Sequence, residues 1–477
     1  MKRSILTALL CVVMGFTACS EGPRPLRMCA EWEPALGTMI VWPLKIPSEL
    51  VRLLAKDEII FVLVAYDEDE RRARTAFDEW GIDPDHVQFI RTSVESEWTR
   101  DYGAQMVFDE TGSLTIVDPV YIDTPVFYAD NPEVKRGEEL LYPGRYPGDD
   151  RTNHDVAAYL GHPLRSIKAF LTGGNFLVDG FRSAFMTRAM VDENNTRMSD
   201  DEFFEIVWQA TGVETIHVLH NTEPFGIQHI DCWLKILDEE TLLVKRAPED
   251  HPEYEGIERN LERIRQLKTR YGRPWEILRI DCPPFGTEPD FITKEEMPAL
   301  PAYTNSLILN RSVLVPLFGG PGDDQAINTY EKAMPGYSVH GILWDQWHSF
   351  DALHCRTRAV FDAGMLRMSH ARVRSVQPAD RPIVVNVEIE AYSRARLIRD
   401  ELTLNWRRRG GSEWNQVQLQ PAEDSGGFAA EIPTQAPDTW LEYYLTAADH
   451  SGRRESLPRT APAGFYSFST VATVSPG

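Results

Sequence analysis

The sequence predicts an α/β region followed by a smaller all-β domain. Between about residues 29 and 371, short apolar runs that suit strands alternate with amphipathic segments that suit helices, which is the pattern of an α/β domain. From residue 372 the helical periodicity disappears, and alternating stretches are separated by turn clusters such as Arg409–Ser412. Short strands with frequent turns over about a hundred residues are typical of an immunoglobulin-like β-sandwich, which we predict for residues 372–477.

Individual elements follow from the same patterns. The α/β strands are predicted from Val-, Ile- and Leu-rich runs: Ile59–Ala65, Leu114–Asp118, Trp233–Leu237, Leu242–Arg246 and Ser306–Pro316. The helices are predicted from amphipathic spacing and good N-terminal caps: Asp67–Trp80, Ser199–Thr211, Gly256–Tyr271 and Asp324–Ala333. The C-terminal strands are predicted from period-two alternation: Ile383–Ile389, Leu402–Arg407, Gln416–Leu419 and Leu441–Ala447.

Length and composition limit the classes of function. A chain of 477 residues indicates at least two domains, and an apolar fraction of 43% is that of a globular protein with large cores. The formal net charge of −23 argues against a nucleic acid as partner, because phosphate binding needs clustered Lys and Arg. An acidic surface attracts cationic ligands, although surface acidity also serves solubility alone.

The first nineteen residues have the pattern of a bacterial export signal. Lys2 and Arg3 precede an apolar run over Ile5–Phe16 that is too short to span a bilayer. The segment Phe16–Cys19 resembles a lipobox, which predicts that Cys19 is lipidated and anchors the exported protein to a membrane of the cell envelope, with residues 20–28 as a tether. An ordinary signal peptide with an incidental cysteine, and therefore a secreted protein, is the alternative.

Four cysteines remain after the signal and the lipobox: Cys29, Cys232, Cys282 and Cys355. No CxxC spacing is present, which disfavours a structural zinc site. If one of the four is a catalytic thiol, the other three can form at most one disulfide in an oxidising compartment.

Three segments place reactive groups beside apolar, strand-like sequence: Glu97–Gly103, Gly226–Asp231 and Ala352–Thr357. His229 and Asp231 are two residues apart, so an extended strand would turn both toward one pocket. Each segment alone also fits a plain structural role. Asp101 suits a turn, Cys355 suits an inert buried thiol, and a polar strand face explains the His–Asp pair.

Taken together, the motifs resemble those of the Porphyromonas-type peptidylarginine deiminase family. That family also includes agmatine deiminases and belongs to the guanidino-group-modifying superfamily. The resemblance spans the α/β region in order, through Trp98–Gly103 (WTRDYG), Leu171–Gly180 (LTGGNFLVDG), His229–Asp231 (HID), Tyr303–Asn310 (YTNSLILN) and Leu353–Thr357 (LHCRT). It implies a five-bladed pseudosymmetric α/β propeller with the active site in its central channel, over a catalytic domain at residues 29–371.

The resemblance also assigns roles that suit the chemistry. A guanidinium is a planar cation and a poor electrophile, so Asp101 and Asp231 are expected to orient it through charge-assisted hydrogen bonds. Cys355 is expected to attack its carbon as a thiolate. His229 is expected to protonate the departing ammonia and then activate water. None of these steps needs a metal or a cofactor.

Three further residues are weaker assignments. Trp98 matches a pocket wall, although a core tryptophan is equally consistent. Asn305 matches a polar residue near the nucleophile, although a buried Asn that satisfies a loop backbone is also consistent. Arg145 is our choice, ahead of Arg151, for a cation that binds a C-terminal carboxylate of the substrate. His354 would point away from Cys355 if its segment were extended.

The expected function is hydrolysis of arginine in peptides or proteins to citrulline and ammonia through a covalent thiouronium intermediate on the cysteine. Agmatine deiminase is the main alternative, although the export signal and the added β-domain are unusual for it. A non-catalytic lipoprotein that binds cationic peptides and an amidinotransferase are further alternatives. The preference for C-terminal, internal or free arginine stays open.

Overall fold

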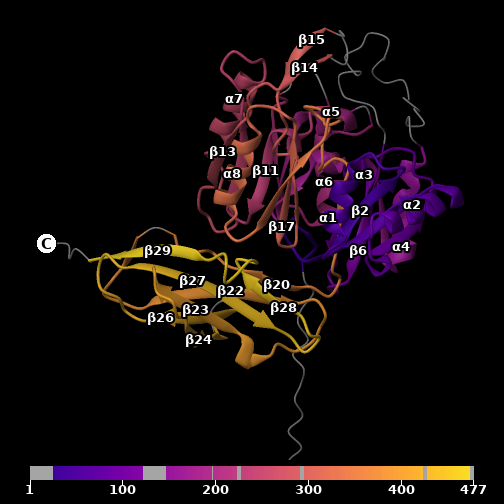
Figure 1. Ribbon diagram of the computed structural model, residues 1–477. Coiled ribbons are helices and arrows are strands. Elements are labelled where there is room, and N and C mark those ends of the chain that lie inside the picture. The colour runs from indigo at the N-terminus through magenta and orange to yellow at the C-terminus, as the bar shows by residue number, and fades with distance from the viewer. Residues whose placement is uncertain are drawn as a thin grey trace, which may run out of the picture.

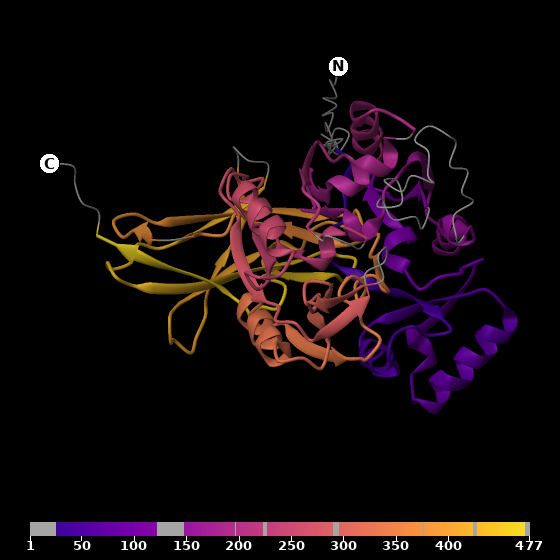
Figure 2. The same ribbon diagram turned by 90° about the horizontal axis from the view of Figure 1, so that it is seen from above.

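The computed structural model describes residues 25–121, 147–195, 197–222, 227–289, 295–374, 376–422 and 427–472. An α/β region comes first and an all-β unit follows it, as Figure 1 shows in the change from indigo and magenta to yellow. Seen from above, the C-terminal strands extend to one side of the α/β region (Figure 2). The expected order of an α/β region before an all-β region is therefore observed.

Five small sheets form most of the α/β region, and they share one connection. In each sheet an antiparallel strand pair is followed by a parallel pair, and one or two helices link the parallel strands. Helices α2, α4, α7 and α8 lie on the outer sides, with β2, β11 and β17 between them (Figure 1). This repeated connection has no counterpart in a recognisable sequence repeat.

The elements of the first two sheets, in sheet order and then helices, are β19 (Arg358–Phe361), β2 (Ala35–Trp42), β3 (Ile59–Val64), β4 (Val87–Arg91), α1 (Ser48–Leu54), α2 (Asp67–Glu79) and η1 (Pro84–His86), then β1 (Arg27–Met28), β5 (Gln105–Phe108), β6 (Leu114–Val120), β7 (Leu164–Phe170), α3 (Thr99–Tyr102), η3 (Asp149–Arg151) and α4 (Thr152–Leu160). The pairing of β19 with β2 joins the two ends of the α/β region.

The elements of the other three sheets are β8 (Leu177–Val178), β9 (Ser183–Thr187), β10 (Thr215–Leu219), η4 (Gly173–Asn175), α5 (Arg188–Asn194) and α6 (Asp200–Thr211), then β11 (Leu234–Asp238), β12 (Thr241–Arg246), β13 (Glu276–Asp281), η5 (Ile230–Cys232) and α7 (Tyr254–Ile264), then β16 (Leu307–Leu309), β17 (Ser312–Leu317), β18 (Ser338–Leu343) and α8 (Asp323–Ala333). A two-stranded sheet pairs β14 (Gly286–Pro289) with β15 (Glu296–Ala299).

Most predicted elements are confirmed within two residues at either end, and the differences have local causes. The single strand predicted over Ser306–Pro316 is a hairpin of β16 and β17, because Asn310 adopts φ of 50° between them. The helix predicted over Gly256–Tyr271 ends at Ile264, because Lys268 pairs with Pro274 around a turn at Gly272. The five sheets are separate, and none closes on itself among the described residues; their arrangement as a propeller stays a prediction.

The C-terminal unit consists of two sheets that pack around a shared core. Their strands are β20 (Leu366–Ser369), β22 (Ile383–Ala391), β26 (Phe428–Ile432) and β25 (Gln420–Pro421) in one sheet, and β21 (Val376–Pro378), β29 (Tyr466–Val471), β27 (Trp440–Ala448), β23 (Thr403–Arg408), β24 (Asn415–Gln418) and β28 (Arg454–Leu457) in the other, with η6 (Arg399–Glu401) between β22 and β23. In β22, Ile383, Val385 and Val387 are buried while Val384 is exposed, which is the alternation of a half-buried strand. The immunoglobulin-like identity of this unit stays a prediction.

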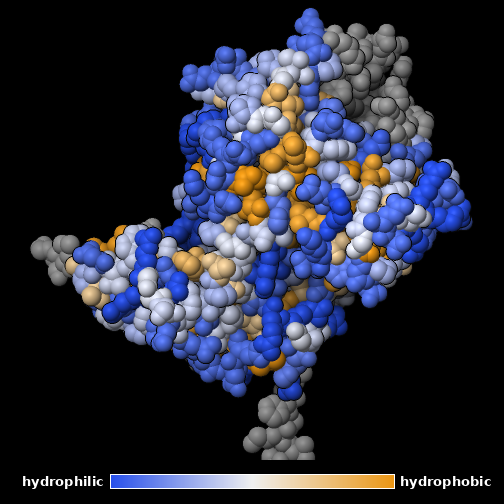
Figure 3. Space-filling view, viewed as in Figure 1, coloured by the Kyte–Doolittle hydropathy of each residue, from blue (hydrophilic) through white to orange (hydrophobic). Residues whose placement is uncertain are grey.

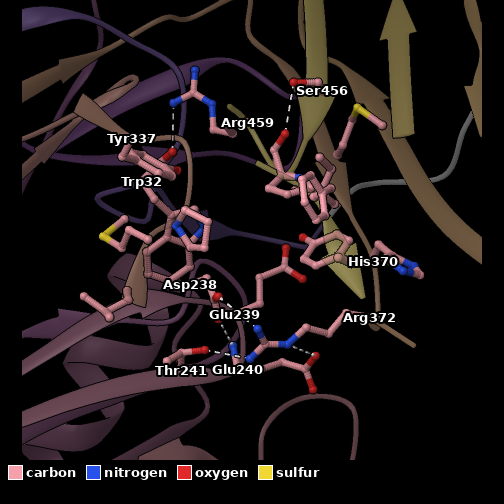
Figure 4. A pocket seen from close by; sticks show the side chains of 18 of the residues that line it. Trp32, Asp238, Glu239, Glu240, Thr241, Tyr337, His370, Arg372, Ser456 and Arg459 are labelled. Carbon is pink, nitrogen blue, oxygen red and sulfur yellow. Dashed lines mark hydrogen bonds and ion pairs between the residues drawn. The ribbon is translucent and has the colours of Figure 1, made fainter. Parts of the chain in front are cut away.

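β20 lies before the predicted boundary at residue 372, yet it pairs with β22 of the C-terminal unit. A cavity of about 560 Å³, shown in Figure 4, is lined by residues of both the α/β region and the C-terminal unit. Arg372 connects its two sides, since it donates to Thr241 Oγ1 at 2.7 Å and pairs with Glu276 at 2.9 Å. Six acidic and five basic side chains line the cavity, so its charge favours neither a cation nor an anion.

Apolar side chains gather on one face of the α/β region, around β11 and β17 (Figure 3). Leu343 in the neighbouring β18 is 60% exposed. Of the helices in the described ranges, none is both long enough and apolar enough to cross a membrane.

His370, at the end of β20, yields a prediction on stability. Its Nδ1 lies beside the carbonyl oxygen of Asn386, its Nε2 lies 2.7 Å from Tyr443 Oη, and burial lowers its pKa to about 4 from the usual 6.5. The folded state therefore favours the neutral ring. Its contribution to the free energy of unfolding, about 3 kcal/mol at most, should be present above pH 6.5 and lost as the pH falls toward 4.

Urea unfolding at several pH values checks this expectation. His370→Gln keeps a donor and an acceptor but cannot gain a proton, so its stability should fall less steeply than wild type between pH 6.5 and 4. Equal slopes for the two proteins would contradict the role given to His370.

Candidate active site

Each of the five sheets is preceded by a short turn; four of these turns carry a candidate residue, and the fifth carries Gly174. Within four residues of the first strand of the antiparallel pair lie, sheet by sheet, Asp101, Gly174, Asp231, Asn305 and Cys355. Hydrogen bonds from backbone N–H groups join these turns directly. Arg100 N donates to Cys355 O at 3.0 Å, and Gly174 N donates to Asp101 Oδ1 at 3.0 Å. The repeated topology thus brings residues from distant parts of the sequence to one place.

Gly174 lies at the point where three of these groups meet. A Cβ atom added to it would be 2.7 Å from Asp101 Oδ1, 2.8 Å from His229 Nδ1 and 3.1 Å from Asp231 Oδ2. Any side chain here would therefore displace both carboxylates and the imidazole. Gly173 and Gly174 belong to η4, and Gly174 also leaves the space that these polar atoms surround.

The His–Asp pair is brought inward by a different geometry from the predicted one. His229 is the N-cap of the 3-10 turn Ile230–Cys232, so the expectation of an extended strand is wrong. The turn still separates the side chains as expected, since Ile230 is fully buried in an apolar cluster while His229 and Asp231 lie beside Gly174. Asn175 Oδ1 accepts a hydrogen bond from Ile230 N at 3.2 Å and so fixes the turn against η4.

Asn305 is the residue closest to the sulfur among the hydrogen-bonding contacts. Its Nδ2 donates to Cys355 Sγ at 3.2 Å, while its Oδ1 accepts from His354 N at 2.9 Å and from Cys355 N at 3.3 Å. The two interpretations of Asn305 thus hold together, because one amide satisfies a loop backbone and contacts the thiol.

His354 contacts Asp231, and the condition of the prediction for this residue is not met, because its segment is a turn and not extended. Residues 353–356 form a turn, which directs His354 Nδ1 to within 2.7 Å of Asp231 Oδ2. Its Nε2 lies 2.7 Å from Glu31 Oε2, and Glu31 Oε1 lies 2.6 Å from Lys235 Nζ. A buried row of ionisable side chains therefore runs from Asp231 through His354 and Glu31 to Lys235.

Trp98 is held at the site by a third carboxylate. Its Nε1 donates to Asp351 Oδ2 at 3.0 Å, and Arg356 Nη2 pairs with the same oxygen at 2.7 Å. Trp98 is partly buried against the largest apolar cluster, so the core interpretation and the pocket-wall interpretation both remain consistent with its position.

Burial and negative charge dominate the electrostatics of the site. Burial raises the pKa of the Cys355 thiol well above its usual value, and Asp231, Asp351 and Asp101 raise it further. Burial also lowers the pKa of His229, against the opposing effect of Asp231. Burial alone would raise the pKa of Asp231, but its hydrogen bond and attraction to His354 reverse this and lower it. The free site thus favours a neutral thiol, a neutral His229 and an ionised Asp231.

Several predictions fall outside this cluster. Arg145 and Cys19 lie outside the described residues. Arg151, the other arginine considered for the substrate carboxylate, is exposed and lies directly before α4. Cys29, Cys232, Cys282 and Cys355 are buried, and no disulfide joins these four. No group of three or more His, Cys, Asp or Glu side chains in the described ranges is placed to hold a metal ion.

Sequence reasoning missed three residues of the site. Asp351 lies one helical turn before Cys355 in sequence, and this spacing could have suggested proximity. Glu31 is more than three hundred residues from His354, and no local pattern signals their contact. Arg100 was counted only as part of a motif, although it donates to the backbone oxygens of both His354 and Cys355.

The chain matches known proteins over this α/β region. The family model described as Porphyromonas-type peptidyl-arginine deiminase matches residues 27–360. A protein of Selenomonas ruminantium, provisionally named agmatine deiminase, is 25% identical over 351 residues, which are 65% of this chain and 89% of that protein. A protein of Mycoplasma capricolum with the same provisional name is 24% identical over 353 residues, 66% of this chain and 90% of that protein.

Solved structures agree in fold. The agmatine deiminase of Enterococcus faecalis superposes with a TM-score of 0.58 at 19% identity, over 72% of this chain and 99% of that one. A Porphyromonas gingivalis protein described as an arginine deiminase gives a TM-score of 0.57 at 18% identity, over 71% and 99%. The family match covers well over half of the chain and includes every candidate residue that the structure describes. The chain therefore belongs to the Porphyromonas-type peptidyl-arginine deiminase family and is a hydrolase that acts on the carbon–nitrogen bonds of linear amidines.

Proposed function

We propose that this chain hydrolyses the guanidinium group of arginine in peptides to a ureido group and ammonia, with Cys355 as nucleophile. The observation that carries the proposal is the grouping of two buried carboxylates and an imidazole around the space at Gly174, next to the turn that holds a buried thiol. A planar cation is the ligand that such a site would neutralise.

Asp101 and Asp231 are the proposed guanidinium ligands. The exposed fraction of Asp101 is 6% and that of Asp231 is 0%, so both carboxylates lie in a low-dielectric environment, where interactions between charges are stronger than in water. Hydrogen bonds to charged groups contribute about 1.5–3 kcal/mol each, and two on opposite edges would also fix the plane of the guanidinium.

The substrate itself would activate the thiol. Without a bound cation, burial and the carboxylates keep the pKa of Cys355 well above its usual value. A guanidinium between Asp101 and Asp231 offsets that negative charge, so the thiolate becomes accessible only when substrate is present. The hydrogen bond that Asn305 Nδ2 donates to Sγ stabilises the anion further.

The reaction then proceeds in two halves. In the first, the Cys355 thiol gives its proton to His229, Sγ forms a bond to the guanidinium carbon, and the C–N bond breaks as His229 passes that proton to the departing ammonia. In the second, His229 takes a proton from water, the hydroxyl adds to the same carbon, and the C–S bond breaks to regenerate the cysteine. His229 suits both transfers because its Nδ1 has no hydrogen-bond partner among the described residues and lies 3.6 Å from Asp101 Oδ1.

Peptide arginine is favoured as substrate by features that a small guanidine would not need. Residues 361–477 lie beyond the family match and include the β-unit, and residues 122–141 expand the segment after Trp98–Gly103. Export and lipid anchoring through Cys19 belong to the same proposal, because peptides are encountered outside the cell. Agmatine is the second candidate, favoured by the names of the relatives that match residues of this region.

Replacement of the nucleophile tests the covalent step. Cys355→Ala and Cys355→Ser should each lower ammonia release by about 10³-fold or more, because neither side chain supplies a thiolate. Thermal unfolding should stay close to that of wild type, since the change removes little volume. Cys282→Ala, at a buried cysteine outside the candidate site, is the matched control and should retain activity. Turnover by Cys355→Ala near the wild-type rate would rule out the covalent route.

Binding and proton transfer can be separated. Asp101→Asn and Asp231→Asn should each raise KM and lower kcat, because an amide neither compensates the cation nor accepts all of its N–H groups. His229→Ala should lower kcat by about 10²–10⁴-fold with little change in KM. Steady-state kinetics on one guanidine substrate gives all three results. Unchanged KM in both Asp variants would mean that the guanidinium binds elsewhere.

A substrate panel identifies the guanidine. Peptides with arginine should release ammonia faster than agmatine or free arginine, and if Arg145 binds a terminal carboxylate, peptides ending in arginine should exceed their amides by about tenfold. Arg145→Ala should then remove this difference and leave the amide rate unchanged. Equal rates on acid and amide would indicate internal arginine, whereas faster turnover of agmatine than of every peptide would establish the second candidate.

A further inference from the structure

Behind Asp231 lie two side chains that the proposed reaction does not use. His354 is fully buried and bridges Asp231 and Glu31, with both nitrogen-to-oxygen distances at 2.7 Å. The other oxygen of Glu31 accepts from Lys235 Nζ at 2.6 Å and from Ile308 N at 2.8 Å. One oxygen of Glu31 therefore accepts two hydrogen bonds, and its other oxygen faces His354.

The two short contacts determine how many protons the group holds. An ionised carboxylate can only accept hydrogen bonds, and a neutral imidazole has a single N–H to donate. Both contacts can be hydrogen bonds only if both ring nitrogens carry a proton, or if one carboxyl group holds it instead. The trio therefore keeps one proton more than a neutral imidazole with two carboxylates. Lys235 disfavours that proton on Glu31, because it stabilises the ionised carboxylate, and so leaves His354 or Asp231 to hold it.

The charged groups around the trio both help and oppose this state. Glu31 and Asp231 attract a proton to His354, whereas burial, Arg100 and Lys235 oppose it and lower its pKa. Two further ionisable groups lie nearby. Arg358, from β19, interacts with Glu31 and Arg100, and His229 interacts with Asp231. The two short distances favour the extra proton. Without it, one ring nitrogen would place its lone pair 2.7 Å from a carboxylate oxygen, and the two would repel each other.

We propose that Glu31 and His354 are positioning residues for Asp231: an imidazolium held by Glu31 keeps Asp231 ionised and fixes its orientation toward the guanidinium. This inference rests on the proposed function, because Asp231 matters here as a guanidinium ligand. Within the described residues, His354 is the group that lies at ion-pair distance from Asp231, and Asp231 Oδ1 contacts only the weak donor Cys232 Sγ, at 3.6 Å. That oxygen is left for the substrate.

The pH profile of kcat/KM provides the first test. Glu31→Gln keeps the shape and removes the charge, so His354 should become neutral and Asp231 easier to protonate. The acidic limb should move to higher pH by about one unit or more, and KM at neutral pH should rise about tenfold. The value of kcat should change much less, because bound guanidinium restores the ionisation of Asp231.

Two variants separate positioning from stability. Glu253→Gln removes a similar buried partner of lysine, since Glu253 Oε2 lies 3.0 Å from Lys245 Nζ on the neighbouring β12, and this variant should leave the acidic limb in place. His354→Gln keeps one donor for Asp231 and should retain more activity at low pH than His354→Phe, which keeps none.

The proton itself can be observed without substrate. In protein labelled with ¹⁵N-histidine, both ring nitrogens of His354 should be protonated at neutral pH, with the signal assigned by its loss in His354→Gln, and Glu31→Gln should leave one proton. Coincident acidic limbs for Glu31→Gln, Glu253→Gln and wild type, or a singly protonated His354 in wild type, would overturn the proposal. Failure of wild type to hydrolyse every guanidine would count against the proposed function alone, and the NMR result would then decide this inference.

Discussion

The site depends on how buried negative charge is compensated. Asp101, Asp231 and Asp351 lie around a thiol that is itself buried, and moving a carboxylate out of water costs several kcal/mol unless partners replace the lost solvation. The backbone N–H of Gly174 stabilises Asp101, Arg356 stabilises Asp351, and His354 stabilises Asp231. Burial and these three carboxylates favour the protonated form of the Cys355 thiol. The arrangement therefore favours an incoming cation over a second anion inside the protein.

The fold supplies this arrangement through repetition. Each of the five sheets begins its antiparallel pair just after a tight turn, and hydrogen bonds join several of these turns to one another. Short turns anchored to strands hold side chains more rigidly than long loops, and rigidity is what a site needs when a misplacement of about an ångström is costly. The pairing of β19 with β2 completes the set, because it fixes the turn with Cys355 against the turn with Asp101.

The sequence predicted the layout of elements well because strands such as β3 and helices such as α6 carry their own apolar pattern and caps. It located Cys355, His229, Asp231, Asp101 and Asn305 through motifs, and the structure brings these residues to adjoining turns. It did not predict the 3-10 turn at His229, because the spacing of two residues that suits a strand also suits this turn. Glu31 and Asp351 were missed because their contacts join segments that share no local pattern.

The alternation of charge from the front of the site to its rear has a consequence for turnover. In the proposed function a cationic substrate would lie against Asp231, which contacts His354, then Glu31, then Lys235, so that with His354 protonated each charge would be flanked by opposite ones. Deimination converts the cation into a neutral ureido group, which can still donate hydrogen bonds but no longer offsets the carboxylates. The attraction that binds the substrate is thus lost in the reaction itself, and hydrogen bonds between neutral and charged groups are weaker than those between two ions. Under the proposed function, the same buried charges that would bind the guanidinium therefore favour release of the product.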